Sequence, residues 1–325
     1  MMPRPHTKFA ILIIAGAISF LVGISTGSSK IGLNEILGLI SGVEKEYVSN
    51  ILDFRLRRTL LSILVGVALS SSGCAMQSLF RNPLADPYII GVSSGASVGA
   101  AIAILTGHGS SINIMAAAFV SAIITVFVVY YLGKDSTYSL LLAGVAMATF
   151  LSGVTSLLIY ISGQSLHQVL FWIMGGFWNA NWFKVKIAFV GSIIGVAVIL
   201  YNSWRLNALL LGEEHALSVG INIERLKREI IAATAFLTAI AVSVSGVIGF
   251  VGLIIPHTMR LLFGEDNRII VPTSILFAFT FMPAVDTIAR IVVPGELPVG
   301  VITSLLGAPF FIYLLRRKRY EAKGQ

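Results

Sequence analysis

Charged residues are scarce in this sequence: they occupy 12% of its 325 positions, whereas hydrophobic residues occupy 56%. A typical soluble domain carries roughly 25% charged residues. Folded in water, the chain would have too little polar surface to cover its apolar residues. The composition therefore excludes a soluble enzyme, a disordered protein and a secreted domain held by disulfide bonds, and it indicates a polytopic membrane protein.

Residues that commonly support catalysis are also few. The single cysteine, Cys74, cannot form an internal disulfide bond, and the five histidines show no metal-ligand spacing. The phosphate-binding Gly-Lys-Ser/Thr motif does not occur, so we expect that this chain does not itself hydrolyse ATP. We interpret Cys74 and Met76 as packing residues. We expect no enzymatic activity, no metal site and no cofactor bound by this chain.

Segments without Asp, Glu, Lys or Arg locate the expected membrane spans. A helix of roughly 20 residues is about 30 Å long, which matches the hydrocarbon core of a bilayer. Polar or glycine-rich interruptions divide the longer segments, and the Trp- and Gly-rich segment 171–182 suits the membrane interface. We predict a single all-α membrane domain over residues 1–325 with ten spans, at approximately 9–27, 58–80, 88–106, 112–132, 138–161, 184–203, 229–248, 254–263, 269–290 and 298–315.

The positive charges predict the orientation. With an even number of spans, both termini lie on the same side of the membrane. Placing them in the cytoplasm puts 15 of the 23 Lys and Arg residues on that side and leaves 8 outside, as the positive-inside rule requires. Anionic lipid then accounts for the net charge of +8, and no nucleic-acid partner is expected. A cleaved signal peptide over residues 9–24 is the alternative to a retained first span.

Ionisable residues inside the spans are the candidates for chemistry. Asp286 and Arg290 are spaced i,i+4 in span 269–290, which favours an ion pair. We interpret them as a structural pair near a helix end, with Arg290 reaching outward to the membrane surface. The alternative is an ion-coupled secondary transporter with a proton site at Asp286. A membrane-embedded enzyme using His257 and Asp286 is a further alternative, although a packing role is the simpler interpretation of His257.

Three arginines lie at the start of span 58–80 or just before it, on the predicted external side and against the general charge trend. Arg55 and Arg58 are spaced i,i+3 and share a face if the helix begins there. Lipid headgroups are one explanation for Arg55, Arg57 and Arg58. A docking patch for carboxylates of an external partner is another, because arginine binds carboxylates bidentately, and Arg290 would lie close enough to join it.

The predicted cytoplasmic loop from Gly212 to Gly220 resembles a short helix. Two acidic residues at its start and Gly220 at its end suit the two ends of a helix. Its apolar residues, Ala216, Leu217 and Val219, suit either a groove in a cytosolic partner or packing onto the bundle itself. In span 88–106, Gly91, Gly95 and Gly99 recur every four residues and predict a ridge for close helix packing.

Motifs in consistent order resemble those of one family. Over about residues 50–315 the sequence is similar to the permeases of the FecCD/BtuC type, through Arg55-Leu56-Arg57-Arg58-Thr59, Asn82-Pro83-Leu84-Ala85-Asp86-Pro87, Gly91-Val92-Ser93-Ser94-Gly95-Ala96, Trp172-Ile173-Met174-Gly175-Gly176, the loop Gly212 to Gly220, and Phe250-Val251-Gly252-Leu253-Ile254-Ile255-Pro256-His257.

The resemblance implies a ten-helix permease of a metal-chelate ABC importer in a prokaryotic cytoplasmic membrane. Ferric siderophore is the substrate expected first, with cobalamin or haem as alternatives. The implied partners are a second permease copy, two cytosolic ATP-binding subunits and an external substrate-binding protein. The resemblance also implies roles for residues: docking of the binding protein for Arg55, Arg58 and Arg290, ATPase coupling for Glu213, Glu214, His215, Ala216, Leu217, Val219 and Gly220, and an inner gate around Thr137 and Tyr138.

Overall fold

All regular structure in the described part of the chain is helical. The computed structural model describes residues 5–27 and 46–321. Its elements are α1 (Pro5–Ser25), α3 (Glu46–Leu79), η1 (Pro87–Ile90), α4 (Val92–Leu105), α5 (Ser111–Gly133), α6 (Thr137–Tyr160), η2 (Gly163–Ser165), α7 (Leu166–Met174), α8 (Trp182–Leu210), α9 (Glu213–Ser218), α10 (Ile223–Ser245), α11 (Val251–Phe263), α12 (Asn267–Ile291) and α13 (Val299–Glu321).

These helices correspond to the predicted spans, with two short additions. The described residues contain twelve α-helices, and each of the ten predicted ranges overlaps one of them. The two additions are α7, which overlaps the start of the segment assigned to the membrane interface, and α9, in the loop expected to be helical. Seven described helices are long and apolar enough to cross a membrane, and α4, α11 and the apolar part of α13 are shorter. The number of ten spans therefore stays a prediction.

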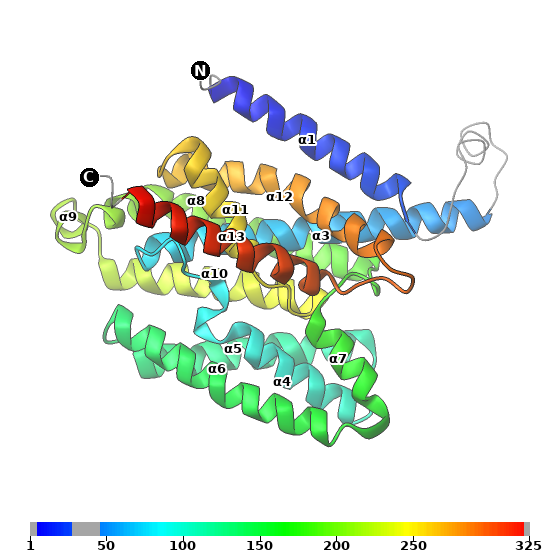
Figure 1. The fold of residues 1–325 in the computed structure, drawn as a ribbon. Helices are drawn as coiled ribbons and strands as arrows, with labels where there is room; N and C mark the ends of the chain where they lie inside the picture. The colour runs from blue at the N-terminus through cyan, green and yellow to red at the C-terminus, as the bar shows by residue number, and fades with distance from the viewer. Residues whose placement is uncertain (1–4, 28–45, 322–325) are drawn as a thin grey trace.

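The centre of the bundle is formed by α3 and α10, which are the most buried of the long helices. They pack against each other, and α3 also contacts α8, α11 and α12. The peripheral helices α1 and α6 are far more exposed. In Figure 1, the start of α1 and the end of α13 lie at the same end of the bundle as α9, which we call the α9 end. The start of α3 and α7 lie at the opposite end, which we call the α7 end.

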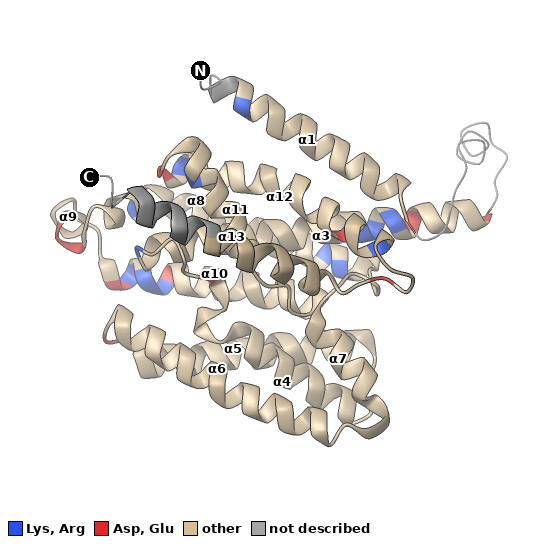
Figure 2. Ribbon diagram, in the orientation of Figure 1, with Lys and Arg blue, Asp and Glu red and all other residues tan. Residues whose placement is uncertain are grey.

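The charged residues lie mainly towards these two ends. Figure 2 shows Lys and Arg side by side with Asp and Glu near the first half of α3 and again near α9 and the start of α10, with few charges between them. This arrangement is the one expected of a bundle whose middle lies in hydrocarbon, where a charged side chain is costly.

Helix α1 is fastened along its length to α11 and α12. Near its start, the Lys8 ammonium donates a hydrogen bond of 2.5 Å to the Leu262 carbonyl, and the Phe9 ring lies 5.2 Å from the Phe263 ring. Further along, the Ser19 hydroxyl donates to the Thr280 carbonyl at 2.8 Å. These contacts hold a helix that otherwise exposes most of its apolar surface.

Several helices begin earlier than predicted, and for α3 and α11 the difference changes the interpretation. Helix α3 begins at Glu46 rather than near residue 58, so Arg55, Arg57 and Arg58 lie within the helix and not before it. The charge-free segment marked only the part in hydrocarbon, whereas the helix continues beyond it. Helix α11 begins at Val251, because the chain turns at Phe250, whose φ is +66°; Pro256 lies inside the helix and does not start it.

Glycines permit the closest helix contacts. At Gly73 of α3, a Cβ atom would collide with the carbonyl of Gly252 in α11. Gly95 and Gly99 lie against α5, where a side chain would collide with Thr125 and with the Ala117 carbonyl. The predicted ridge is therefore present at these two positions. Gly91 differs, because it precedes α4 as its N-cap and has a φ of +80°.

Candidate functional site

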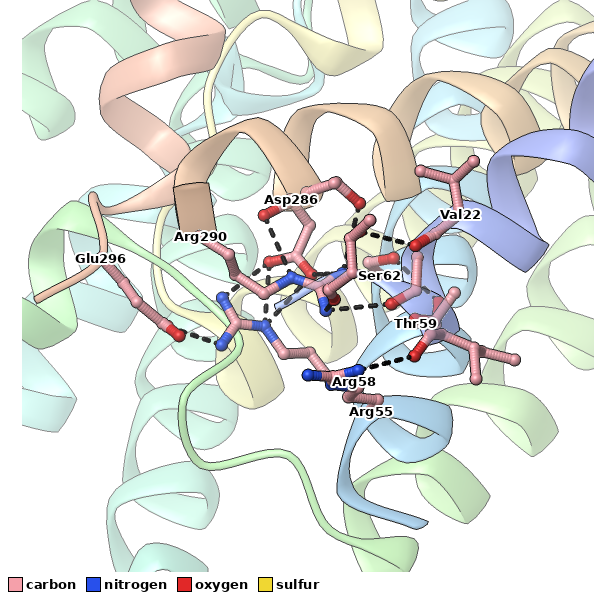
Figure 3. A network of polar contacts seen from close by, with 12 residues as sticks. Val22, Arg55, Arg58, Thr59, Ser62, Asp286, Arg290 and Glu296 are labelled. Carbon is pink, nitrogen blue, oxygen red and sulfur yellow. Dashed lines mark hydrogen bonds and ion pairs between the residues drawn. The ribbon is translucent and has the colours of Figure 1, made fainter. Parts of the chain in front are cut away.

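A buried ion-pair network joins three elements at the α7 end (Figure 3). Its centre is Arg58 of α3, which is 1% exposed. The Arg58 Nε and Nη2 atoms donate to Asp286 Oδ1 of α12 at 3.0 and 2.9 Å, and its Nη1 donates to Glu296 Oε2 at 2.6 Å. Asp286 is completely buried, and Glu296 lies in the loop between α12 and α13. The Arg58 guanidinium thus binds two carboxylates that are both far from Arg58 in the sequence.

Arg290 and Arg55 bind the C-terminal end of α1. Arg290 Nη1 donates to the carbonyls of Gly23 and Thr26 at 2.9 and 3.0 Å. Arg55 Nη1 donates to the Ser25 carbonyl at 2.8 Å. The last carbonyls of a helix lack intrahelical partners and carry partial negative charge, so guanidinium groups stabilise them. We refer to Arg55, Arg58, Arg290, Asp286 and Glu296 as the arginine cluster.

The predicted pair of Asp286 and Arg290 is present, with Nη2 and Oδ2 at 3.1 Å. Arg290 does not reach outward as expected: it is 4% exposed, because its donors are directed to α1. Asp286 therefore faces two guanidinium groups. This arrangement suits a structural ion-pair network, since a buried carboxylate is stable only with cations beside it.

The predicted docking role of Arg55, Arg58 and Arg290 stays a prediction. In this conformation Arg58 is committed to Asp286 and Glu296, and all three arginines are mostly covered. They line one side of a cavity of about 350 Å³ together with Tyr47, Phe54 and Glu296. A partner carboxylate would compete for Arg58 with Glu296, whose side chain is partly exposed.

At the α9 end, the loop helix presents apolar side chains outward. Leu217 and Val219 are 59% and 49% exposed, whereas Ala216 is fully buried. Glu213 forms a 3.0 Å ion pair with Lys227 of α10, which ties α9 to the bundle. Gly220 has a φ of +81° directly after the helix, as predicted for its C-terminal end. Packing onto the bundle therefore accounts for Ala216 but not for Leu217 or Val219.

The residues predicted to form an inner gate lie close to this helix. Thr137 lines a cavity of about 560 Å³ between the turn joining α5 to α6 and the start of α10. The same cavity is lined by Lys134, Asp135, Glu213 and Lys227. Tyr138 is 76% exposed. The gate region and the loop helix thus share one charged cavity, while the gating role itself stays a prediction.

A second polar network at the α9 end was not predicted. Arg260 of α11 donates through Nη2 to the Ser78 hydroxyl at 2.9 Å and through Nε to Gln77 Oε1 at 3.2 Å. Asn267 donates to Asn207 Oδ1 of α8 at 2.9 Å. The network ties α3, α8, α11 and the start of α12 together. The available signal was the pair of polar residues Gln77 and Ser78 inside a charge-free segment.

Asp266 closes this network at the start of α12. Its Oδ1 atom accepts hydrogen bonds from Asn207 Nδ2 at 2.6 Å and from the Arg268 backbone N–H at 2.9 Å. The Arg268 guanidinium also donates to it, and this hydrogen bond is the main reason that the pKa of Asp266 falls to about 2. The carboxylate therefore stays ionised at physiological pH.

The remaining candidates are packing residues. His257 is buried with its ring 6.1 Å from that of Phe310. Cys74 is buried with its Sγ atom 3.3 Å from the Ser274 hydroxyl, and Met76 is fully buried. Within residues 5–27 and 46–321, no group of three or more His, Cys, Asp or Glu residues is placed to hold a metal ion.

The helical bundle, its apolar middle and its polar ends define a multi-pass membrane protein. The family model described as "FecCD transport family" matches residues 12–317. The chain is 45% identical over 272 residues to the cobalamin import system permease BtuC of Halobacterium salinarum, covering 82% of this chain and 73% of that protein. It is 36% identical to the ferric enterobactin permease FepD of Escherichia coli, covering 95% and 93%.

A solved structure agrees with these relatives. A metal-chelate type ABC transporter in an inward-facing conformation superposes with a TM-score of 0.87 at 33% identity, covering 97% of this chain and 100% of that chain. The chain belongs to the FecCD transport family. It is a permease of metal-chelate type ABC importers, in agreement with the resemblance found in the sequence.

Proposed function

We propose that this permease is driven by ATP hydrolysis on separate cytosolic subunits, which bind the permease at α9. The observation that carries the proposal is the outward exposure of Leu217 and Val219 on a helix anchored by Ala216 and by the Glu213–Lys227 pair. An apolar helix face surrounded by polar groups suits a groove on a partner. Because α9 is tied to α10, which lies in the centre of the bundle, a movement of α9 would be transmitted inward. In this proposal the α9 end and both termini are cytoplasmic.

The test is a charge placed on α9. We expect Leu217→Asp to reduce co-purification of the ATPase subunits and to abolish uptake in proteoliposomes. The control is Val292→Asp, a similarly exposed apolar position at the end of α12, two residues after Arg290 of the arginine cluster, which should leave ATPase binding intact. Normal co-purification and normal uptake by Leu217→Asp would refute the assignment of α9.

We further propose that two copies of the chain pair through α6. This helix is apolar yet the least buried of the long helices, with Phe150 and Leu157 exposed on it. Since Cys74 is the only cysteine, a Cys74→Ser background permits clean cross-linking at Phe150→Cys. Disulfide-linked dimers in the membrane are expected. If Phe150→Cys forms no disulfide-linked dimers and Phe127→Cys on the exposed helix α5 does, the interface does not lie at α6.

The substrate proposed first is a ferric siderophore. Cobalamin is the second candidate, because the 45% identical relative is a cobalamin permease, and haem is a third. An external substrate-binding protein would deliver the chelate at the α7 end, close to Arg55 and Arg290. Uptake of labelled ferric siderophore, cobalamin and haem by the complete importer in proteoliposomes distinguishes the three. Transport of none of them would refute the proposed substrate class.

A further inference from the structure

A polar cavity at the α7 end contains a buried lysine. The cavity has a volume of about 410 Å³ and lies between the loop joining α4 to α5, helix α7 and the start of α8. Its polar and aromatic lining includes Gln168, Trp172, Trp178, Asn179, Asn181 and Lys184. Tryptophan is typical of the interface between hydrocarbon and headgroups. The cavity therefore lies where polar parts of lipids are found.

Lys184 has no counterion in the described part of the chain. It is 9% exposed, and none of the described hydrogen bonds or ion pairs involves its ammonium group. Other buried cations of this protein are paired, as Arg58 is with Asp286. An ammonium group on a mostly buried side chain that opens only into a cavity is stabilised when an anion lies beside it. The cavity supplies the space for that anion.

An apolar groove adjoins this cavity. It has a volume of about 570 Å³, lies between α5, α8 and α10, and is lined by Phe119, Phe183, Val190, Ile194 and Phe236, with Lys186 at the α7 end. Ser243 lines both the groove and the polar cavity, so the two are directly adjacent. From Phe183 to Ile194 the groove follows α8 for about 16 Å at 1.5 Å per residue. That length matches one leaflet of a hydrocarbon core of about 30 Å.

We propose that the cavity and groove together bind one anionic phospholipid of the leaflet at the α7 end. The phosphate lies beside Lys184 in the polar cavity, one acyl chain occupies the groove, and Lys186 at the end of the groove adds positive charge. A soluble phosphate compound would use the polar cavity but would leave the groove empty. A zwitterionic lipid would bring its own cation against two lysines. An anionic lipid satisfies both features at once.

Native mass spectrometry of the purified permease with added lipid tests this proposal. The probes are phosphatidylglycerol and phosphatidylcholine with identical acyl chains. We expect the first bound lipid to be phosphatidylglycerol with at least a tenfold preference. The double variant Lys184→Gln/Lys186→Gln should lose this preference, while the control Lys134→Gln, an exposed lysine at the α9 end, should retain it.

A second variant tests the groove without touching the lysines. Ala116 of α5 is exposed and lines the groove, so Ala116→Trp fills it without altering the core, and should abolish retention of the first lipid. If Lys184→Gln prevents folding, Lys186→Gln and Ala116→Trp are measured alone and should each lower the preference. Equal retention of both lipids by the wild type, unchanged preference in the folded variants, or full displacement of the lipid by soluble glycerol 1-phosphate would overturn the proposal.

Discussion

The arginine cluster makes a quantitative prediction about stability. Replacing Arg58 by Met removes the two hydrogen bonds of 2.9 and 3.0 Å that its guanidinium donates to Asp286 Oδ1 and leaves this completely buried carboxylate with Arg290 as its remaining guanidinium partner. Removing one member of a buried ion pair costs about 3–5 kcal/mol. Because Arg290 remains at 3.1 Å and Glu296 is partly exposed, we expect a value near the lower limit, about 3 kcal/mol.

A double-mutant cycle separates the pair from other effects. Arg58→Met with Asp286→Leu removes both charges, so the combined loss should be clearly smaller than the sum of the two single losses. The control is Arg57→Met, since Arg57 pairs with Asp53 at the surface and should change stability by less than about 1 kcal/mol.

The assay is denaturant unfolding in detergent micelles, followed by tryptophan fluorescence. The reasoning would be refuted if Arg58→Met cost no more than Arg57→Met. It would equally be refuted if the two single losses were additive, because that result would mean that the buried contact between Arg58 and Asp286 contributes no coupling energy.

Three further predictions concern other parts of the molecule. Gly73→Ala should lower stability by about 1–3 kcal/mol in thermal unfolding, because its Cβ atom meets the Gly252 carbonyl, whereas Gly153→Ala, which has open space, should be neutral or slightly stabilising. The pKa of Asp266 is lowered to about 2, so the ionised carboxylate stabilises the folded state fully above about pH 4 and loses this effect as the pH falls towards 2. Over that range the difference in unfolding free energy between the wild type and Asp266→Asn should shrink by about 1 kcal/mol. A difference that stays constant with pH would contradict this prediction. Asp286→Asn in proteoliposomes should retain ATP-driven uptake, and no variant or wild type should show uptake driven by an ion gradient alone, which an ion-coupled carrier would require.

Properties local in the sequence were predictable. Charge-free segments located the hydrophobic helices, i,i+4 spacing found the pair of Asp286 and Arg290, and glycine spacing found the contacts of Gly95 and Gly99. The end signals of the loop helix placed α9 almost to the residue. Each of these depends only on neighbours within a few turns of helix.

Contacts between distant segments were not predictable. Arg58 and Asp286 are separated by 228 positions; the sequence indicated only that Arg290 could join Arg55 and Arg58, and no local signal pairs Arg58 with Asp286. The same holds for Arg260 with Ser78, and for the carbonyls of α1 that bind Arg55 and Arg290. The early start of α3 was missed because a charge marks the edge of the membrane and not the end of a helix.

The attachment of α1 at both of its ends has a practical consequence for measurements of conformational change. Since Lys8 ties its beginning to Leu262 of α11 and Arg290 of α12 holds its final turn, α1 is expected to move together with α11 and α12. A fluorescent label on the exposed Ile14 would therefore report the displacement of these three helices during a transport cycle, at a position that leaves both anchoring contacts untouched.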